Sequence, residues 1–294
     1  MQLGVLDIGP IDEMIQLAPA AERLGYTRYW IAEHQPQPSP ILLAMIVAGQ
    51  TDQIRVGTAG VLLHYYPPLR TAHEFHLLER AHTGRIDAGF CAGLTLPGAL
   101  VEGDLDGRDL DAVIAAYPER ARRFVRQLRN TCANPEFDPS LAWPEVGGEP
   151  PQIWSLGTGT RSAELSGELG LGFGYGLMFR KSSDDPEAVK RYRACFVPHR
   201  DRPDPAVVVS VAGVCAESDA AAHAIAEAWQ NPHFLPRVVG DPAACASALA
   251  ALAQRYGADE IVFLHLCSTL ADRLRSIELL AGACGLEPRA APAA

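Results

Sequence analysis

The run AVVVSVAGVCA at residues 206–216 is apolar at nearly every position. A strand with one face in water alternates apolar and polar residues, so this run predicts a strand that is buried on both faces. EIVFLHLC at 260–267 has the same character, and the stretch between the two runs carries helical patterns at 218–229 and 242–256. Strands of this kind, separated by helices, are typical of a parallel β-sheet covered by helices.

The same alternation of strand and helix continues toward the N-terminus. We expect further strands, each followed by helical residues, at 3–7, 27–34, 55–63, 85–93, 152–157 and 172–178. Eight strand–helix units predict an α/β fold, the (β/α)8 TIM barrel, as a single domain over residues 1–285. An open doubly wound sheet is the second interpretation. Residues 286–294 are expected to form a flexible tail.

One segment departs from this rhythm. NTCANPEFDPSLAWPEVGGEPP at 130–151 follows a long helical stretch at 108–129, carries five prolines and shows no periodicity. We interpret residues 131–151 as a loop insertion before the strand at 152–157. Such a loop is either a functional flap or an ordered excursion across one end of the barrel, and the sequence alone leaves both open.

Composition narrows the function classes. The chain has 294 residues and a formal net charge of −10, which argues against binding to nucleic acid or an anionic membrane, because both need a positive field. The sequence shows neither a secretory signal pattern nor an apolar run of about 18 residues, so a cytoplasmic location is expected. The seven cysteines are scattered and include no C-x-x-C pair, which argues against a disulfide framework or a zinc knuckle.

Some charged patterns resemble metal or nucleic-acid sites only loosely. His73, His76 and Glu79 share one face of an expected helix, a spacing that could hold zinc, but no fourth ligand is in view. The acidic run at 102–111 lacks the terminal glutamate spacing of a calcium loop. We interpret both as solvated surfaces and expect no metal site. The arginines between 120 and 129 are expected to form surface ion pairs.

In a barrel of this type the chemistry sits at the carboxyl ends of the strands. The residues expected there are Glu33, His34, His64, Cys91, Ala92, Gly157, Met178, Phe179 and Cys267. Of these, Glu33, His34 and Cys91 are our candidate catalytic residues. His34 is a candidate general acid or base, because histidine exchanges protons near neutral pH, and a purely structural hydrogen-bonding role is the alternative. Cys91 can equally be an inert buried thiol.

The turn LGTGTRS at 156–162 joins an expected strand to an expected helix. Backbone N–H groups, the positive end of the helix macrodipole and several hydroxyls could all face a phosphate here. An ordinary capped helix is the alternative. The G-x-G pattern also mimics a dinucleotide site, but it lies in the fifth unit and no acidic residue ends the next strand. We expect a phosphate to be bound by Gly157, Thr158, Gly159, Thr160, Arg161 and Ser162.

The helix expected at 41–49, ILLAMIVAG, is apolar around nearly its full circumference. An outer helix of a barrel should present a polar face to water, so another surface must cover this one. The pattern therefore predicts that another protein surface covers this helix.

Five stretches together resemble the bacterial-luciferase-like flavin monooxygenases. They are GYTRYWIAEHQ at 25–35, RVGTAGVLLHYYPPLRTAHEFHLLER at 55–80, HTGRIDAGFCAGL at 82–94, PPQIWSLGTGTRSAELSGELGLGFGYG at 150–176 and VVGDPAACASALAALAQRYGADEIVFLHLCSTLADRLRSIELLA at 238–281. The resemblance covers nearly the whole chain apart from the insertion. It implies a barrel enzyme, an oxidoreductase of the two-component type, that oxygenates a small organic substrate. The implied cofactor is reduced FMN supplied by a separate flavin reductase, with O2 as co-substrate, and the implied assembly is a dimer formed through the helix at 41–49.

The resemblance also implies roles for single residues. His34 matches the family's catalytic histidine. The flavin ring would lie over a non-proline cis peptide near Ala59 and Gly60, although glycine in a barrel strand can also simply relieve crowding. Cys91 would line the face of the ring.

Two departures from the family pattern bear on the function. Gln35 stands where a second histidine is usual, and Ala92 stands where relatives commonly carry an arginine that pairs with the FMN phosphate. Arg161 could supply the missing charge. Two alternatives therefore stay open: a non-catalytic or weakly flavin-binding barrel subunit, and a deazaflavin-dependent oxidoreductase of the same superfamily. Aromatic residues expected at the mouth of the barrel suit a planar or apolar substrate; these are Tyr65, Tyr66, Trp154, Tyr175 and Phe179. The arginine- and alanine-rich composition is compatible with secondary metabolism.

Overall fold

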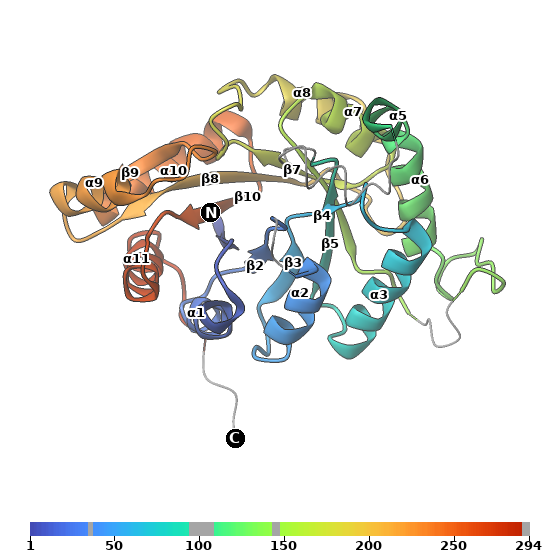
Figure 1. Ribbon diagram of the computed structural model, residues 1–294, viewed down its shortest axis with the longest axis horizontal. Helices are drawn as coiled ribbons and strands as arrows, with labels where there is room; N and C mark the ends of the chain where they lie inside the picture. Colours follow the sequence, from blue (N-terminus) through green and yellow to red (C-terminus); the bar gives the residue numbers. More distant parts are fainter. Residues whose placement is uncertain (35–37, 94–108, 143–147, 290–294) are drawn as a thin grey trace.

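Eight parallel strands close into a barrel in the computed structural model, which describes residues 1–34, 38–93, 109–142 and 148–289 (Figure 1). The last barrel strand pairs with both the first and the seventh, so the sheet has no open edge there. The barrel strands are, in order, β1 (Gln2–Asp7), β2 (Arg28–Ile31), β3 (Arg55–Thr58), β5 (Ile86–Cys91), β6 (Gln152–Gly157), β7 (Gly172–Gly176), β8 (Val207–Cys215) and β10 (Glu260–His265). The expected TIM barrel is confirmed, and the open sheet is excluded.

Helices surround the barrel, and several begin at a side chain that accepts a backbone N–H. Ser218, Asp241 and Thr269 each cap a helix in this way. The helices are α1 (Ile11–Arg23), α2 (Pro40–Ala48), α3 (Pro68–Ala81), α5 (Leu110–Ala115), α6 (Tyr117–Leu128), α7 (Thr160–Glu168), α8 (Glu187–Ala194), α9 (Asp219–Ala228), α10 (Pro242–Tyr256) and α11 (Leu270–Ala283). The single helix expected at 108–129 is wrong: α5 ends at Ala115, because Pro118 has no N–H with which to continue it.

The amino-terminal half of the barrel is filled by a buried polar cluster. The fully buried Asp87 carboxylate accepts hydrogen bonds from Arg28 Nε at 3.2 Å, Arg55 Nε at 2.9 Å and Trp154 Nε1 at 2.9 Å. The Trp154 ring lies 5.2 Å from the Arg28 guanidinium and 4.8 Å from that of Arg202. This packing closes the amino-terminal end, and it shows that Trp154, expected at the mouth, lies in the opposite half.

The third barrel strand is interrupted near its carboxyl end. After β3 comes the cis peptide Ala59–Gly60, and the chain resumes as β4 (Val61–Leu62), which pairs with the end of β5. The expected cis bond is thus present at the expected residues. A side chain at position 60 would come within 2.8 Å of Leu156 Cδ1 and 2.9 Å of Phe90 Cα, so glycine is needed for this close approach.

One strand was not expected. β9 (Pro236–Gly240) pairs in parallel with residues 212–215 of β8, whereas β7 pairs with residues 207–210 of the same strand. β9 therefore occupies the edge of β8 that β7 leaves free toward the carboxyl end. Figure 1 shows β9 beside α9 and α10, at one side of the barrel.

The described parts of the insertion and of the tail both lie at the amino-terminal end of the barrel. The segment 131–151 joins the end of α6 to the start of β6, and its described part forms turns in which Asn130 and Asp138 exchange hydrogen bonds of 2.9 and 2.8 Å. This position favours the ordered excursion over a flap at the strand ends. The structure does not support the expected flexibility for the described part of the tail. There the Arg289 N–H donates to the Arg23 carbonyl and the Arg289 guanidinium donates to the Tyr26 carbonyl.

Candidate active site

Glu33 follows β2 and holds β4 and the residues after it in place. Its Oε2 accepts a hydrogen bond from the Leu62 N–H at 2.7 Å, and its Oε1 accepts one from the Tyr66 hydroxyl at 2.6 Å. Burial and the Glu33 charge raise the pKa of Tyr66, so this hydroxyl remains a donor. From the other side, Arg120 Nε donates to the Leu63 carbonyl at 2.6 Å. The geometry therefore favours a positioning role for Glu33, and Arg120 is more than a surface arginine.

His34, the next residue, is fixed at one ring nitrogen. Its Nε2 lies 2.8 Å from the carbonyl oxygen of Ile8, which follows β1. A carbonyl can only accept, so Nε2 must carry a hydrogen in both the neutral and the charged ring. The proton that His34 gains or loses is therefore the one at Nδ1. Gln35, its neighbour, lies outside the described residues.

Cys91 ends β5 beside the break between β3 and β4. Burial, reinforced by the negative charge of Glu33, raises the pKa of its thiol to about 12. The Sγ atom lies 3.8 Å from the Gly60 carbonyl oxygen. A thiol of this pKa is protonated at neutral pH, so the structure favours a lining role over a nucleophilic one. Ala92 follows directly and is partly exposed.

The turn between β6 and α7 presents an uncapped helix N-terminus. Gly159 is the N-cap and brings no side chain, and its surroundings are open, since an added Cβ would meet nothing within 4 Å. The N–H groups of the first helical turn have no acceptor within the helix. Thr158, Thr160 and Arg161 are exposed, and the Arg161 guanidinium has no ion-pair partner in the described part of the chain. These features fit an anion, such as a phosphate group.

Ser162 behaves differently from the other residues of this turn. Its hydroxyl donates to the Gly159 carbonyl at 2.8 Å and fills the space that a side chain at Gly157 would occupy. The Ser162 hydroxyl hydrogen is therefore used in a bond within the turn, which it stabilises.

The strand order brings these features onto one arc of the rim. The barrel runs β1, β2, β3, β5, β6, so His34 lies at one end of the arc and the 157–162 turn at the other. The Ala59–Gly60 peptide and Cys91 lie between them. A ligand held at the turn and reaching to His34 must cross this peptide and this thiol.

Other expected rim residues are buried or face outward. His64 is 1% exposed, and its ring packs 5.1 Å from that of Tyr117. Tyr175 stacks on Tyr256 at 5.7 Å, and its hydroxyl donates to the Ser183 carbonyl, so it is not at the mouth. Burial raises the pKa of Cys267 to about 12, which leaves that thiol protonated too.

The loose metal patterns are not supported. His76 is 7% exposed and its Nε2 lies 3.0 Å from the Leu128 carbonyl, so the expectation that it is solvated was wrong; α6 covers this face of α3. Within the described ranges, no three His, Cys, Asp or Glu side chains are arranged to hold a metal ion. Most of the acidic run at 102–111 falls outside those ranges.

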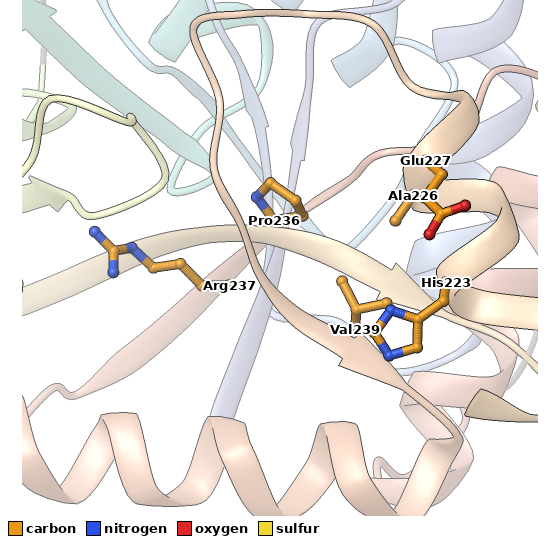
Figure 2. A pocket seen from close by; sticks show the side chains of 6 residues that line it. All are labelled: His223, Ala226, Glu227, Pro236, Arg237 and Val239. Atoms are coloured by element: carbon orange, nitrogen blue, oxygen red, sulfur yellow. The ribbon is translucent and has the colours of Figure 1, made fainter. Parts of the chain in front are cut away.

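A cavity of about 350 Å³ lies between α9 and β9, away from this arc (Figure 2). It is lined by His223, Ala226, Glu227, Pro236, Arg237 and Val239. The Arg237 side chain points away from the rest of this group in Figure 2 and donates to the carbonyl oxygens of Leu177 and Ser182. The cavity therefore lacks a free cation and forms a site separate from the expected one.

None of the described helices is long and apolar enough to cross a membrane.

Comparison with known proteins identifies the relationship. A luciferase-like monooxygenase of Escherichia coli strain K12 is 28% identical over 74% of this chain and 67% of its own length. The crystal structure of apo-MsnO8 superimposes with a TM-score of 0.83 at 29% identity, over 98% of this chain and 99% of that one.

More distant structures share the fold alone. A type II Baeyer–Villiger monooxygenase in complex with FMN gives a TM-score of 0.69 at 18% identity, covering 97% of this chain and 98% of that one. An F420-dependent secondary alcohol dehydrogenase gives 0.73 at 12% identity, covering 96% and 98%. The model of the luciferase-like monooxygenase family matches residues 2–236. The chain therefore belongs to the luciferase-like monooxygenases.

Proposed function

We propose that the protein is a two-component flavin monooxygenase that uses reduced FMN and O2 to oxygenate a small organic substrate. The observation that carries this proposal is the arc of the rim on which an open, uncapped helix N-terminus, a non-proline cis peptide and a histidine follow one another. Bound reduced FMN would supply the electrons for O2 activation. A separate flavin reductase would supply the reduced cofactor, in the cytoplasm.

The phosphate of FMN would bind at the first turn of α7. Gly159 leaves the backbone N–H groups open, and Thr158 and Thr160 add exposed hydroxyls. Ala92 brings no charge to this end of the arc, so Arg161 is the cation that we assign to the phosphate. The flavin ring would then lie across Cys91 and the Ala59–Gly60 peptide.

His34 would hold or move a proton at Nδ1. Its Nε2–H is bonded to the Ile8 carbonyl, which fixes the ring, and Nδ1 has no partner among the residues that the structure describes. Glu33 would not itself transfer protons; it would fix the segment from Leu62 to Tyr66 beside the flavin.

The homodimer would form through α2. Leu42 and Ile46, one turn apart, are 62% and 45% exposed, and Leu77 of the neighbouring α3 is 45% exposed. Exposed apolar side chains of this size on two neighbouring helices are costly to leave in water.

Two other functions are favoured by a single observation, the alanine at position 92. Without the arginine, FMN affinity could be too low for catalysis, or the site could serve a deazaflavin. Anaerobic titrations with FMNH2 and with reduced F420 decide between the three. The proposal expects saturable FMNH2 binding that is tighter than F420 binding; the reverse order favours the deazaflavin enzyme, and binding of neither favours the non-catalytic subunit.

A further inference from the structure

We propose that Phe179 and Phe234 form a preformed apolar wall of the substrate site, which binds an uncharged aromatic ring. This inference rests on the proposed monooxygenase function and adds to it a class of substrate and the residues that select it. Three observations support it: the position of Phe179, the way Phe234 is held against it, and the chemistry of its surroundings.

Phe179 stands at the carboxyl rim, beside the turn assigned to the cofactor. It follows β7 by three residues, and its ring lies over Gly176, the last residue of that strand. A side chain at position 176 would come within 3.1 Å of two carbons of the Phe179 ring and 3.2 Å of the Thr158 methyl group. The Phe179 ring and Thr158 therefore flank the same glycine at the end of β7. Phe179 is partly exposed, so part of its ring is open to a ligand.

Phe234 stacks on Phe179 because β9 brings it there. The ring centroids are 5.6 Å apart and the planes differ by 25°. The two residues form an antiparallel bridge, in which the Arg180 N–H donates to the His233 carbonyl and the Leu235 N–H to the Met178 carbonyl, both at 2.9 Å. Phe234 is only 9% exposed and covers one face of the Phe179 ring.

The Arg237 side chain also holds the segment that carries Phe179 in place. Arg237 of β9 donates to the Leu177 carbonyl at 2.8 Å and to the Ser182 carbonyl at 3.1 Å. The segment that carries Phe179 is therefore tied to β9 by backbone and side-chain bonds. A rigid wall loses little conformational freedom when a ligand binds, which favours affinity.

The charged side chains beside the pair are already bonded to backbone carbonyl oxygens: Arg180 donates to those of Pro232 and Phe234 at 3.3 Å, and Arg237 to those of Leu177 and Ser182. Phe179 and Phe234 belong to one apolar cluster with Met178, Trp229, Val214 and Leu266. The charged and proton-carrying groups of the rim, Arg161 and His34, follow β6 and β2 instead. A charged substrate group would lose its hydration at this wall without gaining a partner, whereas an aromatic ring gains an offset-stacked neighbour. The wall therefore selects an uncharged ring.

Calorimetric titration with 2-naphthol and its anionic counterpart 2-naphthoate tests this assignment, on the full chain with and without FMN. We expect 2-naphthol to bind at least about tenfold more tightly than 2-naphthoate. Phe179→Ala should weaken 2-naphthol binding about tenfold, and Phe179→Leu, which keeps most of the apolar surface and guards against misfolding, by less. Val197→Ala, at an exposed apolar residue that follows α8 and has no place in the proposed sites, should change nothing.

The outcomes separate this inference from the proposed function. FMN affinity should be the same in Phe179→Ala as in the native chain. Unchanged 2-naphthol affinity in Phe179→Ala, equal binding of 2-naphthoate, or no 2-naphthol binding at all would overturn the wall. Loss of FMN affinity in Phe179→Ala would also overturn it, because the pair would then cover the flavin. Failure of the native chain to bind FMN would instead refute the proposed function, while the 2-naphthol comparison would still decide the wall.

Discussion

Replacing Arg161 by alanine should weaken FMN binding and leave riboflavin binding unchanged. The two ligands differ in the phosphate, and Arg161 is the cation that we assign to that group. A hydrogen bond to a charged group contributes about 1.5–3 kcal/mol, which corresponds to roughly ten- to a hundredfold in affinity. Arg161 is exposed, so solvent screening places the expected loss near tenfold. The remaining affinity comes from the backbone N–H groups at the start of α7, which the substitution keeps.

Quenching of flavin fluorescence measures both affinities in one format. Arg126→Ala is the matched control, because Arg126 is an exposed arginine of α6 far along the chain from the turn. The Arg161 effect should shrink as ionic strength rises, whereas the riboflavin affinity should not respond. Equal losses for FMN and riboflavin, or an unchanged FMN affinity in Arg161→Ala, would refute the assignment of the phosphate to this turn.

Other consequences concern stability and assembly. Glu33→Ala removes a charged acceptor of two hydrogen bonds and should lower the free energy of unfolding by roughly 1.5–3 kcal/mol in urea titrations; an unchanged midpoint would contradict its positioning role. In sedimentation velocity, Leu42→Glu should convert a dimer into a monomer, whereas Val197→Glu, at another exposed apolar residue, should not. A native chain that is itself monomeric would refute the proposed interface. Burial and the Arg273 charge lower the pKa of His265 to about 3, against about 6.5 in the unfolded chain. Between these two pH values the unfolded chain binds a proton at His265 that the folded chain does not. The free energy of unfolding therefore falls as the pH falls from about 6.5 to about 3. The loss should reach up to about 1.4 kcal/mol per pH unit, and His265→Asn should reduce it; equal pH dependence of the two proteins would count against this account.

The barrel could be predicted because its strands are buried on both faces, and continuous apolar runs such as 206–216 report this burial directly. β9 could not, because PRVVG is short, begins with proline and pairs with only half of β8. A single helix at 108–129 was predicted because the apolar spacing continues on both sides of Pro118. The structure has two helices there, α5 and α6. Periodicity also cannot show that His76 lies under α6, because that contact joins helices distant in sequence.

For the site, the residues alone predicted an anion site at the turn before α7 and a proton-transfer role for His34, since both follow strands. The cis peptide at Ala59–Gly60 came from the family resemblance, because backbone isomerism leaves no pattern in composition or spacing. The hydrogen-bond partners of Glu33 could not be predicted from the sequence, since they depend on how the chain turns around β4. Phe234 gave no signal either, because its place at the rim depends on β9.

Anaerobic titration of the native chain with FMNH2, followed by admission of O2, tests the central claim most directly. The account predicts saturable binding of one FMNH2 per chain, followed by O2 consumption that matches the bound flavin and proceeds at a rate different from that of free FMNH2. Absence of binding up to high micromolar flavin, or reoxidation indistinguishable from that of free flavin, would contradict it.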